Sequence, residues 1–488
     1  MTGSTPLPHR FSLAAGVLAA LLAVAACQSS QNARPAQGED PRPVAGGVAA
    51  PGAYDPDRPL GTLGAPPPGT EPNRPGAPLF GGTLAPSAEP GLAARGTVET
   101  GGVVPPPPAA GVTRVAMLVP MTGPVGPLGK AMANAAQLAL FDFAGPQFEI
   151  TFYDSQGTAD GAARAAAEAV ADGASMILGP LLADSVTAAA PIARAANVRV
   201  VAFSSTRQVA GDGVYTLGFL PSAQVRRVVD YALNRGLRTF AALAPDNDYG
   251  RTVVAALQQA AEAGGGALGQ VRYYDPTTEE FAELVRELAD FDARQAELER
   301  QKAALRGRKD EVSKRALARL AKLQTVGDVS FDALMIAEGG KRLQNIAAHL
   351  PYYDIDPVKV RILGTGLFDE PGIGTEPALV GAWFAAPPPG ARADFVTAYK
   401  RTYGDAPPRL ATLAYDAAAL AAVLARQGPG SLANDAMLTS PSGFLGRDGI
   451  FRFSLEGIAE RGLAVIEVRE RELTVIGPAP ASFEGFIN

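Results

Sequence analysis

The sequence has very few of the side chains that bind metals or form cross-links. Its 488 residues include one cysteine, Cys27, and two histidines, His9 and His349. A disulfide needs two thiols, and a structural zinc site usually needs four nitrogen or sulfur ligands. We therefore expect no disulfide, no metal site and no catalysis by a cysteine–histidine pair.

The common catalytic motifs are also absent. GPVGPLGK resembles a phosphate-binding loop, but five residues rather than four separate Gly123 from Gly129, and Ala131 stands where a magnesium-binding hydroxyl belongs. GTGLFD lacks the third glycine of a dinucleotide fingerprint, and no G-x-S-x-G or H-E-x-x-H motif occurs. We expect no enzymatic activity and no cofactor, although the many carboxylates leave a glycosidase open. A pI of about 5.3 argues against nucleic-acid binding.

The N-terminus has the pattern of an export signal. Residues 11–26 are almost wholly Ala, Leu and Val. This run is shorter than the roughly 20 apolar residues of a membrane-spanning helix, so it predicts a signal peptide over residues 1–26 rather than a short buried helix. The VAAC that ends at Cys27 resembles the lipobox of bacterial lipoproteins, which implies that Cys27 is lipidated. Gln28 in place of Asp implies an anchor in the outer membrane, facing the periplasm.

Residues 27–112 have the composition of a disordered tether. Eighteen of the 42 prolines lie between residues 28 and 112, and the segment shows no apolar periodicity. Such a chain buries too little apolar surface to offset the entropy cost of ordering it. It would span about 50 Å as a flexible coil and about 260 Å as polyproline II. We expect a folded part that works far from its membrane, or a spacer without specific sequence requirements.

The remaining residues alternate between apolar strands and amphipathic helices. RVAMLVP, FEITFYD, ASMILGP and VRVVAF are typical of buried strands, with helical patterns of ten to fifteen residues between them. Such alternation predicts doubly wound α/β lobes with parallel sheets. We place one lobe at 113–237, a second at 238–400, and a C-terminal crossover at 401–488 that returns between the lobes. A ligand cleft is expected where the strands end.

Four stretches resemble, in order, the type I periplasmic binding proteins of the leucine/isoleucine/valine-binding group. They are VAMLVPMTGPVGPLGKAMANAAQLAL, GPLLADSVTAAAPIARAANVRVVAFSST, LAPDNDYGRTVVAALQQAAEAGG, and YYDP with EEFAELVREL and FDALMIA. The resemblance spans roughly residues 113–475 and implies a bilobal Venus flytrap that captures small solutes for ABC transporters. A lipid-anchored branch of the family, the Lpo-type activators, stimulates penicillin-binding proteins in peptidoglycan synthesis.

The resemblance also implies a ligand site in the cleft. In amino-acid-binding members, the loop after the fourth strand holds the ligand through backbone groups and a hydroxyl, and an aromatic side chain closes over it. Ser204, Ser205 and Thr206 occupy the loop here, and Tyr249 matches the aromatic residue. The hydroxyls alone fit a second interpretation, because strand-end turns often carry Ser and Thr that cap the next helix.

Two positions depart from the amino-acid-binding pattern. Pro221 and Gly366 stand where the family places acidic residues, the second of which pairs with the ligand's ammonium. A buried ammonium without a carboxylate partner costs several kcal/mol. The departures therefore argue against a free amino acid as ligand, unless Asp369 or Glu370 supplies the missing charge.

A segment at residues 290–329 has no counterpart in the family. Apolar residues recur at helical spacing on both sides of Gly307, which predicts a helical hairpin. The two stripes are Leu284, Phe291, Leu298 and Leu305, then Val312, Ala316, Leu320 and Leu323. Residues 294–322 contain ten Lys/Arg and four Asp/Glu, a net of +6 in a chain of net −6. Such a hairpin is either a solvated structural element or a docking surface for a partner. The docking candidates are Arg300, Arg306, Arg308, Lys309, Lys314 and Arg315.

Two functions fit this sequence. The first is a non-catalytic outer-membrane lipoprotein that regulates a penicillin-binding protein. The alternative is a solute-binding receptor of a branched-chain-amino-acid-type ABC transporter. The expected partners are a peptidoglycan synthase, a small amino-acid-like or peptide ligand, and the membrane through the lipid anchor, with no nucleic acid.

Overall fold

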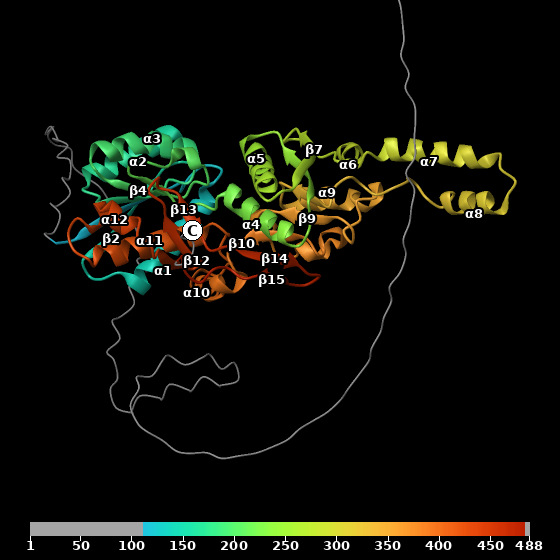
Figure 1. Ribbon diagram of the computed structural model, residues 1–488. Coiled ribbons are helices and arrows are strands. Elements are labelled where there is room, and N and C mark those ends of the chain that lie inside the picture. The colour runs from blue at the N-terminus through green and yellow to red at the C-terminus, as the bar shows by residue number, and fades with distance from the viewer. Residues whose placement is uncertain (1–110, 484–488) are drawn as a thin grey trace, which may run out of the picture. The chain divides into compact units, whose positions relative to one another are not determined.

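The computed structural model describes residues 111–483 (Figure 1). The predicted signal peptide, the lipidated Cys27 and all but the last two residues of the predicted tether lie outside the described residues. Within 111–483, no helix is both long enough and apolar enough to span a bilayer.

The first lobe is built on a parallel five-stranded sheet in the order β2-β1-β3-β4-β5. Alternate residues of β1 face opposite sides of this sheet. Met117 and Val119 pack in the core beneath α1, whereas Ala116 and Leu118 pack in the core beneath α2 and α3. The sheet is therefore covered on both faces, as predicted. The elements are β1 (Thr113–Val119), α1 (Gly126–Phe143), β2 (Phe148–Asp154), α2 (Ala159–Ala171), β3 (Met176–Leu178), α3 (Ala183–Ala195), β4 (Arg199–Ala202) and β5 (Val214–Thr216).

The second lobe contains a seven-stranded sheet in the order β15-β14-β10-β9-β8-β6-β7. Strands β6 to β10 run parallel, as predicted, and β14 runs antiparallel to both of its neighbours, β10 and β15. The chain leaves this lobe from β10 and re-enters it at β14, so these neighbouring strands run in opposite directions. The elements are α4 (Pro221–Asn234), β6 (Thr239–Pro245), α5 (Asp248–Ala263), β7 (Ala267–Tyr274), α6 (Ala282–Leu288), β8 (Ala333–Ile336), α9 (Gly340–His349), β9 (Arg361–Gly364), β10 (Trp383–Ala386), β14 (Ala464–Val468) and β15 (Leu473–Gly477).

The boundary between the lobes differs from the one predicted at residue 237. Helix α4 lies before that boundary in sequence but packs in the second lobe, where Val228 shares a core with Phe240 and Leu257. The first lobe thus ends near residue 220. The apolar face of α4 is visible in the sequence, but the sequence does not say which sheet covers it.

The C-terminal part returns first to the first lobe and then to the second. Helix α10 packs in the first lobe through Phe395 and Tyr399, so the predicted boundary at residue 400 is wrong and falls inside this helix. Helix α11 lies along α1, and a small antiparallel sheet of β11, β12 and β13 precedes the return to β14. The elements are α10 (Ala393–Tyr403), α11 (Ala411–Ala425), α12 (Asp435–Leu438), β11 (Phe444–Gly446), β12 (Gly449–Phe453) and β13 (Ala459–Arg461).

Short 3-10 helices connect several of these elements. They are η1 (Arg207–Val209), η2 (Pro351–Tyr353), η3 (Gly366–Phe368), η4 (Ile373–Thr375), η5 (Pro377–Leu379), η6 (Pro389–Arg392) and η7 (Ser431–Ala433).

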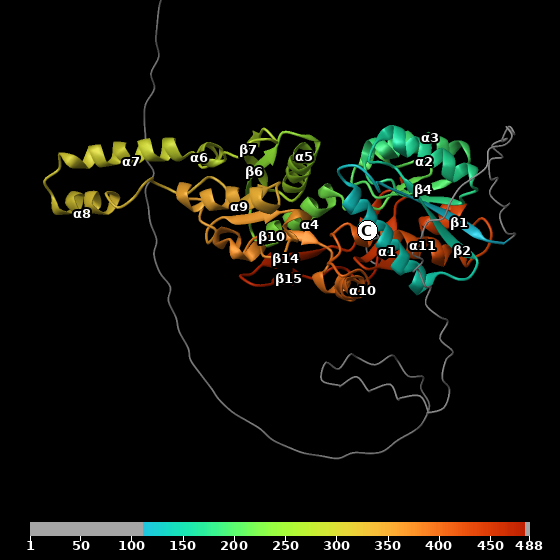
Figure 2. The same ribbon diagram turned by 180° about the vertical axis from the view of Figure 1, so that it is seen from behind.

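The insertion forms the expected helical hairpin of α7 (Phe291–Arg306) and α8 (Glu311–Leu320). Both views show it extending from the second lobe, away from the first (Figures 1 and 2). Asp310 caps α8, because its side chain accepts a hydrogen bond from the backbone N–H of Ser313.

The apolar stripes predicted for the hairpin are only partly correct. Leu298 and Leu320 are buried, but Val312 is 78% exposed and Leu323 is 45% exposed. In α8 the face toward the protein carries Ser313 and Leu320, so this helix is rotated from the predicted phase.

The base of the hairpin is fixed by one arginine. The Arg294 guanidinium donates to the carbonyl of Ala289 at 2.9 Å and to Thr325 Oγ1 at 2.9 Å, and it lies 3.5 Å from Asp354 Oδ2. Its side chain is 11% exposed. Arg294 therefore joins α7 to the segments that follow the hairpin, and it is structural.

Candidate functional site

A cavity of about 660 Å³ lies between the two lobes. This size falls within the roughly 300–1,000 Å³ typical of small-molecule sites. Its walls are mainly apolar, with a few polar groups from both lobes. The apolar lining includes Val125, Leu128, Leu181, Leu182, Phe203, Phe219, Leu367 and Leu410. The five cleft residues predicted from the sequence all line it: Ser204, Ser205, Thr206, Tyr249 and Asp369.

The loop after β4 forms the polar part of the first lobe's wall. Ser204 is 3% exposed, and its Oγ accepts a hydrogen bond from the backbone N–H of Thr206 at 3.1 Å. Ser205 is exposed. The chain after β5 passes so close that a Cβ on Gly218 would lie 2.3 Å from the Ser204 carbonyl oxygen. Because Gly218 has no side chain, the chain after β5 can pass next to the loop after β4. The Ser204 hydroxyl stabilises that loop through its hydrogen bond with Thr206.

Two hydrogen bonds order the second lobe's wall. Tyr249, near the start of α5, shares a hydrogen bond of 2.7 Å between its hydroxyl and Thr365 Oγ1. Burial raises the pKa of Tyr249 to about 12, so the hydroxyl stays protonated at neutral pH. Gln224 in α4 accepts a hydrogen bond from the backbone N–H of Gly366 at 3.0 Å. The Tyr249 ring is therefore held in place at the cavity wall.

The carboxylate of Asp369 is already engaged by two arginines. Arg392 Nη2 lies 2.9 Å from one oxygen, and Arg409 Nε lies 3.1 Å from the other. The Asp369 side chain is 3% exposed. The sequence left open whether Asp369 or Glu370 could pair with a ligand ammonium, and this geometry leaves Asp369 poorly placed to do so.

Glu370 is the cavity's unengaged carboxylate. It lines the cavity, is exposed, and makes no side-chain hydrogen bond or ion pair with any residue in 111–483. It follows β9 on the second lobe, whereas the loop of Ser204 lines the cavity from the first lobe. Of the two acidic residues considered, Glu370 is thus the one free to meet a cation.

A buried charge cluster, which sequence reasoning missed, joins the two lobes beside the cavity. Asp369 follows β9 of the second lobe, while Arg409 precedes α11 on the first. Arg409 Nη2 also lies 3.0 Å from Asp448, whose side chain is 1% exposed, and its guanidinium stacks 4.4 Å from the centre of the Phe219 ring. Asp369 and Arg409 are 40 positions apart in the sequence, so no local sequence pattern predicts that they pair.

The sequence pattern described as periplasmic binding protein matches residues 112–441, about two thirds of the chain. The chain belongs to the periplasmic binding protein family. Its two-lobed fold is that of the type I members, as the sequence resemblance implied.

Several solved structures have the same two-lobed fold as this chain. One assigned to a branched-chain amino acid ABC transporter, from Rhodospirillum rubrum, has a TM-score of 0.60 at 20% identity, covering 75% of this chain and 100% of that one. A solute-binding protein from Rhodopseudomonas palustris BisB5, in complex with 3,4-dihydroxybenzoic acid, has a TM-score of 0.55 at 20% identity, with coverages of 75% and 96%. LivJ from Streptococcus pneumoniae, in complex with isoleucine, has a TM-score of 0.52 at 17% identity, with coverages of 75% and 100%. At such identities the likeness shows the fold alone.

A curated relative is an uncharacterized protein of Rickettsia prowazekii (strain Madrid E). It is 24% identical over 176 residues, which cover 36% of this chain and 47% of the relative. The chain thus matches about half the length of this relative.

The structure divides the predicted docking residues of the hairpin into two groups. Three are ion-paired with glutamates of the hairpin, and three are exposed without a side-chain hydrogen bond or ion pair to residues in 111–483. The paired residues are Arg300, Arg306 and Lys314, and the unpaired ones are Arg308, Lys309 and Arg315. Arg319 and Lys322 are exposed and unpaired in the same way, and the sequence prediction omitted them.

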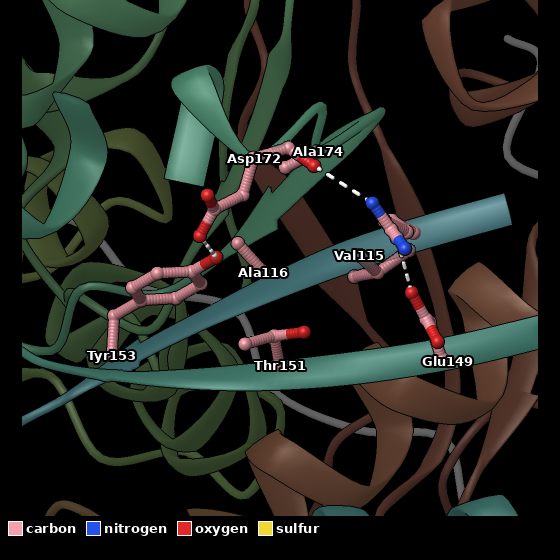
Figure 3. Close-up of a pocket in the computed structure, with 8 residues that line it drawn as sticks. Val115, Ala116, Glu149, Thr151, Tyr153, Asp172 and Ala174 are labelled. Atoms are coloured by element: carbon pink, nitrogen blue, oxygen red, sulfur yellow. Dashed lines mark hydrogen bonds and ion pairs between the residues drawn. The ribbon is translucent and has the colours of Figure 1, made fainter. Parts of the chain in front are cut away.

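Another cavity, of about 230 Å³, lies at the edge of the first lobe's sheet (Figure 3). Its polar groups satisfy one another: Arg114 pairs with Glu149, and the Tyr153 hydroxyl donates to Asp172 Oδ2 at 2.7 Å. Burial and the hydrogen bond to Asp172 raise the pKa of Tyr153. These internal pairs leave few groups for a ligand, so the interlobe cavity is the better candidate.

Proposed function

We propose that this chain is a non-catalytic solute-binding receptor that holds a small ligand between its lobes for an ABC transporter. The interlobe cavity carries this proposal, because it has the volume of a small-molecule site, apolar walls and convergent polar groups. The solved structures of similar fold support it, since they include ABC transporter proteins in complex with isoleucine and with 3,4-dihydroxybenzoic acid.

The polar groups of the cavity fit an apolar amino acid. The loop at Ser205 offers hydroxyls and backbone groups for the ligand's carboxylate, and Glu370 on the opposite lobe offers a carboxylate for its ammonium. An aliphatic side chain would lie against Leu128, Leu181 and the other apolar walls. Glu370 would then pair with the ligand's ammonium in place of the acidic residue that Gly366 replaces.

The receptor function predicts stabilisation by a ligand. We expect leucine, isoleucine or valine to raise the Tm of the unlipidated chain, because a ligand at 100 times its Kd that binds only the folded state adds about 2.7 kcal/mol. Thermal unfolding with these amino acids and with their deaminated acids measures the effect. The amino acids should stabilise more than the acids, since only they pair with Glu370.

Two tryptophan variants locate the effect. Ser205→Trp would fill the cavity from an exposed position and should abolish the shift. Ser175→Trp, also exposed on the first lobe but outside the cavity, should keep it. No shift with any amino acid or organic acid would count against the receptor function.

We also propose that the protein is exported and held in the outer membrane, facing the periplasm, through a lipid on Cys27. Cys27→Ala should move the protein from the membrane fraction to the soluble fraction, because the substitution removes the thiol to which the lipid is attached. Fractionation of cells with detection by immunoblot measures this. A Cys27→Ala protein that still sediments with membranes in 0.5 M salt would refute the anchor.

A second candidate function is regulation of a penicillin-binding protein by a non-catalytic lipoprotein. The projecting basic hairpin favours it, because ligand capture in the cavity does not need such an element. The ligand experiment separates the two candidates, since a regulator with a vestigial cleft would show no stabilisation by any solute.

A further inference from the structure

Five cations of the hairpin have no partner within the described residues. We call Arg308, Lys309, Arg315, Arg319 and Lys322 the basic ridge. All five are exposed, and none makes a side-chain hydrogen bond or an ion pair with residues in 111–483. The neighbouring Arg300, Arg306 and Lys314, by contrast, are paired with glutamates one or two turns away. The ridge is thus the part of the hairpin whose charge the hairpin itself does not neutralise.

The ridge faces solvent rather than the rest of the protein. Helix α8 buries Ser313 and Leu320. At 3.6 residues per turn, Arg315 and Arg319 lie on the opposite side of the helix, and Lys322 follows in the same line. Val312, which is 78% exposed, lies one turn before Arg315.

The hairpin separates this positive charge from an acidic body. Residues 294–322 carry a net +6, whereas the rest of residues 111–483 carries a net −10. The 16 residues of α7 extend about 24 Å, at 1.5 Å per residue. That length exceeds the screening length of about 8 Å at physiological ionic strength. The negative body therefore does not cancel the potential of Arg308 and Lys309, which lie at the tip of the hairpin between α7 and α8.

We propose that the basic ridge docks on the anionic headgroups of a lipid bilayer. Clusters of four to eight Lys/Arg on an amphipathic helix are typical of such peripheral membrane contacts. The centres of protein interfaces combine Arg with aromatic residues and Met, and they are poor in Lys. Residues 294–322 contain no aromatic residue and no Met, so their composition favours the lipid surface over an acidic protein.

Vesicle sedimentation tests the proposal on the full chain carrying Cys27→Ala, which removes the predicted lipid. The probe is a vesicle of 30% phosphatidylglycerol in phosphatidylcholine, compared with pure phosphatidylcholine. We expect binding to the anionic vesicles only, and weaker binding at 300 mM than at 50 mM salt. Replacing Arg315, Arg319 and Lys322 together with Gln should weaken binding on the order of 100-fold.

The matched control replaces the paired cations Arg300, Arg306 and Lys314 with Gln. It removes the same charge from the same hairpin. If this variant loses less than tenfold of its affinity for anionic vesicles, the exposed ridge makes the contact. Equal losses in the two triple variants would overturn the proposal, as would equal binding to both kinds of vesicle or no binding at all. Ridge-dependent retention on immobilised polyglutamate without vesicle binding would also overturn it and assign the ridge to an acidic protein. Stabilisation by amino acids should be unchanged in the ridge variant, so failure here leaves the receptor function untouched.

Discussion

Replacing Arg409 with Met is expected to lower the free energy of unfolding by about 3–5 kcal/mol, the range for removing one partner of a buried ion pair. Arg409 lies between two carboxylates that are almost fully buried, Asp369 and Asp448. Without the guanidinium, Asp448 loses its ion-pair partner among residues 111–483, and Asp369 keeps Arg392. Because the pair also joins the two lobes, the variant should unfold earlier in urea at pH 7.

Arg251→Met is the matched control for this experiment. Arg251 pairs with Asp246 and Asp248, but its side chain is 54% exposed, so its loss should cost less than about 1 kcal/mol. Adding Asp448→Asn to Arg409→Met should recover part of the lost stability, because the unpaired buried charge is then removed. Similar costs for Arg409→Met and Arg251→Met would show that the buried cluster contributes no more than a surface pair.

The two-lobed fold could be predicted from sequence because the repeated signal is local. A strand such as β1 is apolar and buried from Val115 to Val119, and a helix such as α1 carries small apolar residues on its buried face. The assignment of a helix to a lobe is not local. Both α4 and α10 carry apolar faces, and only the folded chain shows which sheet each one covers.

The cleft residues were found through family resemblance rather than from their chemistry. Ser204 and Thr206 follow β4 of the first lobe and Tyr249 follows β6 of the second, so strand ends from both sheets meet at the cavity. The resemblance made Asp369 a cleft candidate but could not show that arginines already pair with its carboxylate. Those partners, Arg392 and Arg409, are 23 and 40 positions away in the sequence. Contacts between carboxylates and distant arginines depend on how the crossovers pass between the lobes.

The hairpin shows the same limit on a smaller scale. The pairing of Lys314 with Glu311 follows from a spacing of three residues and could be read from the sequence. The exposure of Val312 could not, because it depends on where α8 begins and how it rotates against the protein. Spacing defines a helix face, whereas tertiary contacts decide which face is covered.

Replacing Asp416 with Asn is expected to flatten the dependence of stability on pH between about 5 and 8. Asp416 lies in α11 and is 2% exposed, and one of its oxygens has no hydrogen-bond donor within 111–483. Burial, with the nearby negative charge of Asp448, raises the pKa of Asp416 to about 7. The unfolded value is about 3.9, so the folded protein binds this proton more tightly. The resulting stabilisation is fully present below about pH 4 and is lost as the pH rises through about 7.

Urea unfolding of both proteins at pH 5 and pH 8 measures this difference. The rise of the pKa from about 3.9 to about 7 corresponds to about 4 kcal/mol in all, of which about 2.7 kcal/mol lies between pH 5 and pH 8; the wild-type chain should lose this part and Asp416→Asn should not. The amide can still accept the backbone N–H of Arg447, which lies 2.7 Å from Asp416 Oδ1, so the turn between β11 and β12 should persist. Asp275→Asn is the control, because hydrogen bonds from Thr277 lower the pKa of this exposed carboxyl and place its titration below the window. Parallel pH profiles for the wild type and Asp416→Asn would mean that Asp416 stays ionised in the folded protein, with Arg461 as the nearby cation that compensates its charge.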